Sequence, residues 1–101
     1  IIFDLYNYLD KSNVDKMYDI LAEGLQTFGG RICVFHIKDC RIEEDGSLKQ
    51  CGVGKGIFDY SKILSQIIKV CPDANLVFEG TTGEDIPYAV SYIKETIKNI
   101  S

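Results

Sequence analysis

Three short apolar runs alternate along the chain with three segments whose apolar residues recur at helical spacing. The apolar runs are Ile1–Tyr6, Ile32–Ile37 and Leu76–Phe78, and Glu79 follows the third run directly. The runs are continuous, whereas a strand with one solvated face alternates apolar and polar residues. They therefore predict three strands that are buried on both faces of a parallel sheet.

The segments after these runs carry apolar stripes typical of amphipathic helices. Ser12 is the expected N-cap of the first helix, and Gly29–Gly30 is its expected end. Asp59 is placed to cap the second helix, and Asp85 and Pro87 stand at the start of the third. The three stripes consist of Val14, Met17, Tyr18, Leu21, Leu25 and Phe28; of Tyr60, Ile63, Leu64, Ile67, Ile68 and Cys71; and of Ala89, Tyr92, Ile93, Thr96, Ile97 and Ile100.

A regular alternation of strands and helices implies a parallel sheet with right-handed crossovers. A (β/α)8 barrel of the TIM type uses about 31 residues for each strand and helix. The second unit of this chain is longer, because the polar stretch Lys38–Phe58 follows its strand on the side where barrel enzymes have their active-site loops. Three units are too few to close a barrel. The expected fold is therefore an α/β fragment of such a barrel, in the order βαβαβα, and the alternative is a complete small domain with an open sheet.

The composition argues against some classes of partner. The 101 residues carry a net charge of −4, and the Lys and Arg residues are scattered instead of forming a basic stripe. This distribution argues against nucleic acid and against an anionic membrane, and no apolar stretch is long enough to span a bilayer. The four cysteines form no C-x-x-C pair, which favours a reduced, cytoplasmic location. Since the first residue is Ile1 and not Met, we expect the chain to start inside a strand.

An ionisable residue stands near the carboxyl end of each apolar run. Asp4 lies in the first run, His36 lies in the second, and Glu79 comes directly after the third. One such residue alone is more often a loop cap or a hydrogen-bonded core group, but burying three of them without partners costs several kcal/mol. Two carboxylates and one imidazole suit a divalent cation, and Mn²⁺, Mg²⁺, Co²⁺ and Zn²⁺ all remain open.

Three strings of residues resemble the xylose-isomerase-like sugar phosphate isomerase/epimerase superfamily. They are Phe35–Asp39, Gly54–Tyr60 and Leu76–Gly80. Members of that superfamily carry an H-x-K-D strand end, a G-x-G-x-x-D-[FY] loop that enters a helix, and a last strand that ends in Glu. The resemblance implies that residues 1–101 form the C-terminal portion of the barrel domain, with its last three units and without its N-terminal units.

The resemblance also implies a set of metal ligands. Ketohexose epimerases of this superfamily hold one metal with Glu, Asp, His and Glu from four strands. By their positions in the motifs, Asp4 would be the second ligand, His36 the third and Glu79 the fourth. The first glutamate would stand on a strand before Ile1. We therefore expect the isolated chain to bind metal weakly or not at all, and to be inactive by itself.

The reaction that the resemblance implies is proton transfer next to the carbonyl of a sugar or sugar phosphate, through an enediolate. Glu79 would be both a metal ligand and an acid/base. Lys38 and Arg41 are candidates for binding substrate hydroxyls or a phosphate, although Arg41 is more simply a solvated surface charge. Asn7 stands where some epimerases have a substrate-contacting His. A related dehydratase activity remains an alternative.

Two other functions are also compatible with the sequence. The chain is expected to be a non-catalytic fragment or binding module if it lacks the rest of its barrel, and a related apurinic endonuclease would need more His ligands than the one present. We expect a homo-oligomer or association with the missing barrel units, because a cut barrel exposes sheet edges. The glycines at 52, 54 and 56 predict turns that deliver Asp59 to its helix, in preference to a phosphate cradle.

Overall fold

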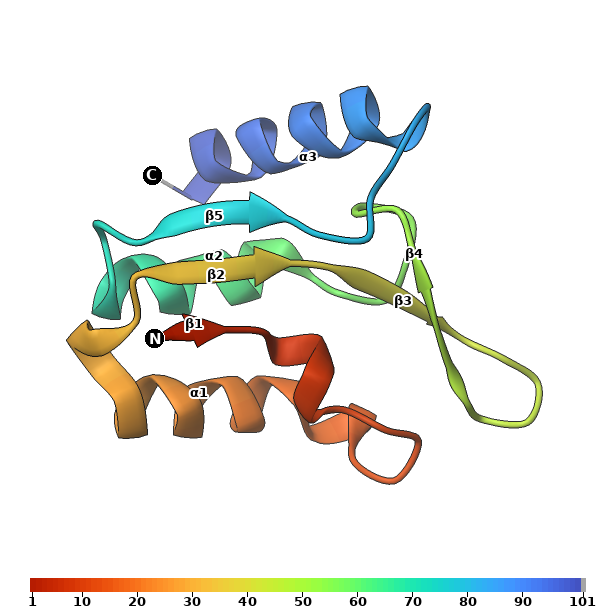
Figure 1. Cartoon of the computed structure of the whole chain (residues 1–101), viewed down its shortest axis with the longest axis horizontal. Coiled ribbons are helices and arrows are strands. Elements are labelled where there is room, and N and C mark those ends of the chain that lie inside the picture. The colour runs from red at the N-terminus through yellow and green to blue at the C-terminus, as the bar shows by residue number, and fades with distance from the viewer. Residues whose placement is uncertain (101) are drawn as a thin grey trace.

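Three parallel strands lie at the centre of the computed structural model, which describes residues 1–100 (Figure 1). β1 (Ile2–Phe3) pairs with β2 (Val34–Ile37), and β2 pairs on its other side with β5 (Asn75–Phe78). All pairs are parallel and the order is β1-β2-β5, so the predicted parallel α/β arrangement is confirmed. β1 is shorter than its apolar run, because a 3₁₀ helix, η1 (Leu5–Tyr8), begins directly after Asp4.

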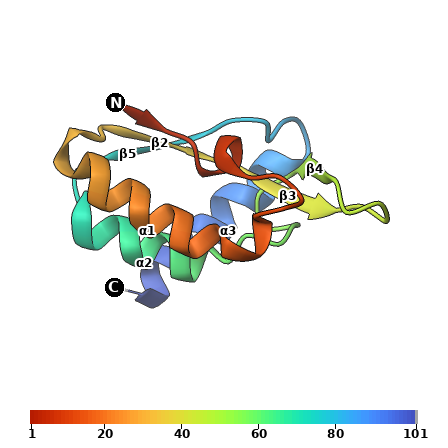
Figure 2. The same cartoon turned by 90° about the horizontal axis from the view of Figure 1, so that it is seen from below.

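Three α-helices follow the three strands and lie on one side of the sheet, as Figure 2 shows. They are α1 (Met17–Phe28), α2 (Tyr60–Val70) and α3 (Asp85–Ile100). Two short 3₁₀ helices, η2 (Val14–Lys16) and η3 (Gly29–Arg31), flank α1. Within residues 1–100, none of the helices combines the length and the apolar content that crossing a membrane requires.

Only one face of the sheet is covered, so the expectation that the strands are buried on both faces is wrong. Phe35 and Ile37 point into the core and are buried, whereas their neighbour His36 is only partly covered. On the uncovered face Ile2 is 60% exposed and Val77 is 44% exposed. All three helices pack on the same side, and a continuous apolar run does not reveal whether a second layer exists.

The core lies between the sheet and the helices. Phe3 packs with its ring against Phe28 and Phe35. Gly24 of α1 lies directly over the Phe3 ring, where a Cβ atom would clash. The helix can therefore approach β1 closely only because this position has no side chain. The other buried apolar residues are Leu5, Met17, Leu21, Leu25, Ile32, Ile37, Cys40, Val53, Phe58, Tyr60, Ile63, Leu64, Ile67, Cys71, Ala89 and Ile93.

The helix ends agree with the sequence at most positions. Gly29 ends α1 with φ +51°, and Asp59 caps α2 by accepting hydrogen bonds from the backbone N–H groups of Ser61 (3.0 Å) and Lys62 (3.4 Å). The predicted Ser12 cap is wrong. Ser12 instead donates to Asp10 Oδ1 from its hydroxyl (2.5 Å) and its backbone N–H (2.8 Å), because the chain first makes an Asx turn and only then enters η2.

The polar stretch after β2 contains an antiparallel hairpin that the sequence analysis did not predict. Its strands are β3 (Asp39–Ile42) and β4 (Leu48–Cys51). The turn is closed by Glu43 and Ser47, whose backbones are hydrogen bonded at 2.8 Å. A single residue, Lys38, separates β3 from β2, so the hairpin continues past the carboxyl end of the sheet (Figure 1).

Candidate functional site

The strand register places the ionisable residues on the uncovered face. Phe3 of β1 pairs with Phe35 of β2 and faces the helices. The next residues, Asp4 and His36, therefore point to the opposite face, because side chains alternate along a strand. The same alternation brings Glu79 to this face. Val77 pairs with His36, so Glu79, two residues after Val77, lies beside Lys38.

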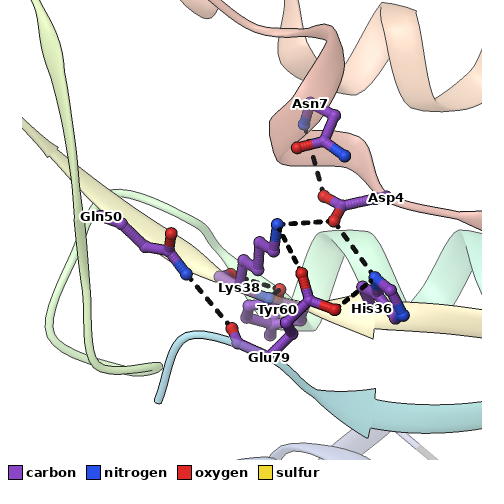
Figure 3. Close-up of polar contacts among 7 residues, drawn as sticks. All are labelled: Asp4, Asn7, His36, Lys38, Gln50, Tyr60 and Glu79. Atoms are coloured by element: carbon purple, nitrogen blue, oxygen red, sulfur yellow. Dashed lines mark hydrogen bonds and ion pairs between the residues drawn. The ribbon is translucent and has the colours of Figure 1, made fainter. Parts of the chain in front are cut away.

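Four side chains form a closed ring of polar contacts at this end of the sheet (Figure 3). His36 Nδ1 lies 3.3 Å from Asp4 Oδ2 and 3.1 Å from Glu79 Oε2. Lys38 Nζ lies 2.7 Å from the same Asp4 oxygen and 3.1 Å from Glu79 Oε1. We call Asp4, His36, Lys38 and Glu79 the strand-end cluster.

The two carboxylates of the strand-end cluster differ in their accessibility. The Asp4 side chain is only 7% exposed, and its second oxygen accepts a hydrogen bond from the backbone N–H of Asn7 at 3.3 Å. The Glu79 side chain is 50% exposed. Asp4 is therefore shielded from solvent and tethered to the backbone, whereas Glu79 is accessible to a bound molecule.

Lys38 is the cation of the strand-end cluster, and only 9% of its side chain is accessible. Desolvation lowers its pKa, but the hydrogen bonds and charges of Asp4 and Glu79 outweigh this effect, so the net pKa is raised. Its backbone is fixed by Tyr60, whose hydroxyl accepts from the Lys38 N–H (3.0 Å) and donates to the Lys38 carbonyl (2.5 Å). Tyr60 is a positioning residue; the sequence indicated it as part of an apolar helix stripe and as the last residue of the Gly54–Tyr60 string, but not as a contact of Lys38.

Asp39 is a second residue whose role the sequence analysis missed. It is fully buried, and its carboxylate accepts four backbone hydrogen bonds. Oδ1 accepts from Cys40 (2.8 Å) and Phe58 (3.0 Å), and Oδ2 accepts from Gly54 and Gly56 (3.0 Å each). Burial raises the pKa of this carboxyl, and the four N–H donors oppose part of the shift.

The glycine loop is therefore anchored on a side chain of the protein itself. Gly54 has φ +92°, and a Cβ atom at Gly56 would overlap Asp39 and the Cys40 carbonyl. Both N–H groups point at Asp39, so they are not arranged as a phosphate cradle. The prediction that the glycines form turns leading to the Asp59 cap is confirmed.

The remaining candidate residues lie away from the centre of the cluster. Arg41 is exposed on β3, where it pairs across the hairpin with Lys49. Asn7 is exposed and reaches Asp4 through its backbone. Gln50 of β4, which the sequence analysis did not single out, donates from Nε2 to the Glu79 carbonyl at 3.3 Å and joins the hairpin to the last strand. Substrate-binding roles for Lys38, Arg41 and Asn7 stay predictions.

The donor set fits a divalent cation. Asp4, His36 and Glu79 each offer one ligand atom, and these three atoms lie within 4.8 Å of one another. Atoms bound at about 2.1 Å to one ion lie about 3.0 to 4.2 Å apart. The two contacts of His36 already match this range, so small side-chain rotations would bring all three atoms onto one ion.

Comparisons with known proteins add no further assignment. No family model, no curated protein and no solved structure matches this chain. The resemblance to sugar phosphate isomerases and epimerases stays a prediction that rests on the three strings of residues named above.

Proposed function

We propose that this chain is the C-terminal part of a (β/α)8 barrel and contributes three metal ligands to a divalent-metal-dependent sugar or sugar phosphate isomerase or epimerase. The observation that carries the proposal is the convergence of Asp4, His36 and Glu79. They follow three neighbouring parallel strands, share the uncovered face, and offer ligand atoms within 4.8 Å of one another. In α/β folds with parallel strands, active sites form at this end of the sheet.

The accessibility of the two carboxylates suggests their roles. Asp4 is buried and tethered, which suits a ligand that stays in place. Glu79 is half exposed and would be one acid/base for the proton at the carbon next to the substrate carbonyl. In an epimerase, the glutamate expected on the further strand would exchange the proton on the opposite face of the enediolate. A bound divalent ion would supply positive charge that stabilises the negative oxygen of the enediolate. His36 would ligate the ion beside both carboxylates, whose nearest oxygens lie 3.3 and 3.1 Å from its Nδ1.

The uncovered face supports the barrel part of the proposal. In a closed barrel, the face opposite the helices is filled by side chains from the other strands. Here Ile2 and Val77 point from that face into solvent, and β1 and β5 are the edge strands of the sheet. Additional strand-helix units beside β1 would cover these residues and would bring a further strand end to the cluster, where the fourth ligand is expected.

The proposal is tested in a longer protein that contains this chain and the remaining barrel units. His36→Ala should strongly reduce the bound divalent metal, measured by elemental analysis, together with exchange of the substrate α-proton in D₂O, measured by NMR. Lys69→Ala changes an exposed residue of α2 on the helical side and should leave both unchanged. Normal metal content and normal exchange in a folded His36→Ala protein would refute the site.

A further inference from the structure

Lys38 occupies part of the space that a metal ion in the strand-end cluster would need. Its Nζ lies 2.7 Å from Asp4 Oδ2 and 3.1 Å from Glu79 Oε1. These are carboxylate groups that would ligate the ion. An ion bound to Asp4 Oδ2 at about 2.1 Å would lie no more than about 5 Å from the ammonium. Two cations at this distance in a partly buried site repel each other strongly.

We propose that the Lys38 ammonium is an internal counter-ion that competes with a divalent cation for Asp4 and Glu79, so that metal loading and release of Lys38 are one event. This inference rests on the proposed metal site and adds its regulation. Without metal, the ammonium lies between the two carboxylates and offsets part of their negative charge, which reduces their mutual repulsion. With metal, the ion takes over that task and the lysine side chain leaves.

An aromatic ring already lies beside the ammonium in its carboxylate-bound position. The centroid of Tyr6 is 5.6 Å from Lys38 Nζ, and an aromatic face that stabilises a nearby ammonium would still be within reach after release. The backbone of Lys38 stays fixed by Tyr60, so only the flexible methylene chain needs to move. A loaded site would then present an uncommitted ammonium next to the exposed Glu79, which is where a substrate hydroxyl or phosphate would meet it.

Competition has a measurable consequence for metal affinity. The apparent affinity of a ligand falls in proportion to the fraction of protein that is free to bind it. Removing the ammonium should therefore tighten metal binding, even though the same substitution removes the ion pairs of Lys38 with Asp4 and Glu79. A lysine that only supported the structure of the cluster would act in the opposite direction, and its removal would weaken binding.

The test is titration with Mn²⁺ alone of the longer protein that contains this chain and the remaining barrel units, where the fourth ligand is expected, with the free ion measured by electron paramagnetic resonance. Lys38→Met and Lys38→Gln both remove the charge, and Gln keeps hydrogen-bond donors toward Asp4 in case Met prevents folding. Lys38→Arg keeps the charge. Lys55→Met is the matched control for net charge, because Lys55 is exposed and pairs with Asp85 on the surface at 2.7 Å.

In the longer protein we expect Lys38→Met or Lys38→Gln to bind Mn²⁺ at least about tenfold more tightly than the wild type. Lys38→Arg and Lys55→Met should stay near the wild-type affinity. If the uncharged Lys38 variants bind Mn²⁺ no more tightly than the wild type, the competition is refuted. The proposed metal site would not be affected by that result. Absence of Mn²⁺ binding in every folded variant would overturn the competition together with the metal site of this chain.

Discussion

Asp39 provides a sharp test of how the loop beside the site is held. Each of its carboxylate oxygens accepts two backbone hydrogen bonds, at 2.8 to 3.0 Å. The substitution Asp39→Asn keeps the size of the side chain and replaces one acceptor oxygen by an NH₂ group. Whichever way the amide is turned, that NH₂ faces two backbone N–H donors and accepts from neither.

The expected loss follows from these two donors. A buried backbone N–H without a partner costs about 1–3 kcal/mol, so two of them cost about 2–6 kcal/mol. A small domain has a total stability of only about 5–15 kcal/mol. Asp39→Asn should therefore destabilise the chain strongly, and the loop that contains Gly54 and Gly56 should lose its fixed conformation first.

The assay is urea unfolding followed by far-UV circular dichroism, with Asp59→Asn as the matched control. Asp59 undergoes the same chemical change at a helix N-cap, where Asn caps about as well as Asp. Its substitution should change the stability by less than about 0.5 kcal/mol and leave turnover of a longer protein nearly unchanged. A loss below about 1 kcal/mol for Asp39→Asn would refute the view that this carboxylate anchors the loop.

Two further predictions concern the surface and the cysteines. Light scattering at low micromolar concentration should give a mass above the 11.3 kDa of one chain, because the uncovered face and the free strand edges recruit partners. A stable, cooperatively folding monomer would indicate a complete small domain instead. Iodoacetamide at about pH 8 should modify the exposed Cys33 well before the buried Cys40, since only the thiolate reacts. Burial raises the pKa of the Cys40 thiol to about 11, and equal labelling rates by mass spectrometry would contradict this.

The sequence predicted the helices and the parallel sheet because these depend on local periodicity. The stripe from Tyr60 to Cys71 and the Asp59 cap lie within one segment of chain, and both are confirmed except at Ile68, which is 42% exposed. The end of β1 was not predictable from apolar character, because Leu5 and Tyr6 continue the run. Asp4 ends that strand by accepting from the N–H of Asn7 and starting a 3₁₀ turn.

The missed features of the site depend on contacts between distant segments. Asp39 holds residues 54 to 58, and no local pattern marks an aspartate that will be buried by a loop far along the chain. The β3–β4 hairpin has polar residues on both strands, so it lacks the apolar alternation that announces a half-buried strand. Lys38 was expected to bind substrate. Its ion pairs with Asp4 and Glu79 depend on how side chains that follow three different strands meet in space, which the spacing of residues along the sequence does not show.

Strand alternation explains why two acidic residues of the same region have opposite environments. From His36 to Asp39 the side chains point alternately to the two faces of the sheet, since β3 continues the path of β2. Ile37 and Asp39 face the covered side, where the carboxylate is surrounded by backbone N–H donors of the glycine loop. His36 and Lys38 face the uncovered side, where the Lys38 ammonium contacts Asp4 and Glu79. A shift of this segment by one residue would exchange the two environments, leaving the ammonium buried without a carboxylate and the glycine loop without its anchor. The loop anchor and the strand-end cluster are therefore two consequences of one register.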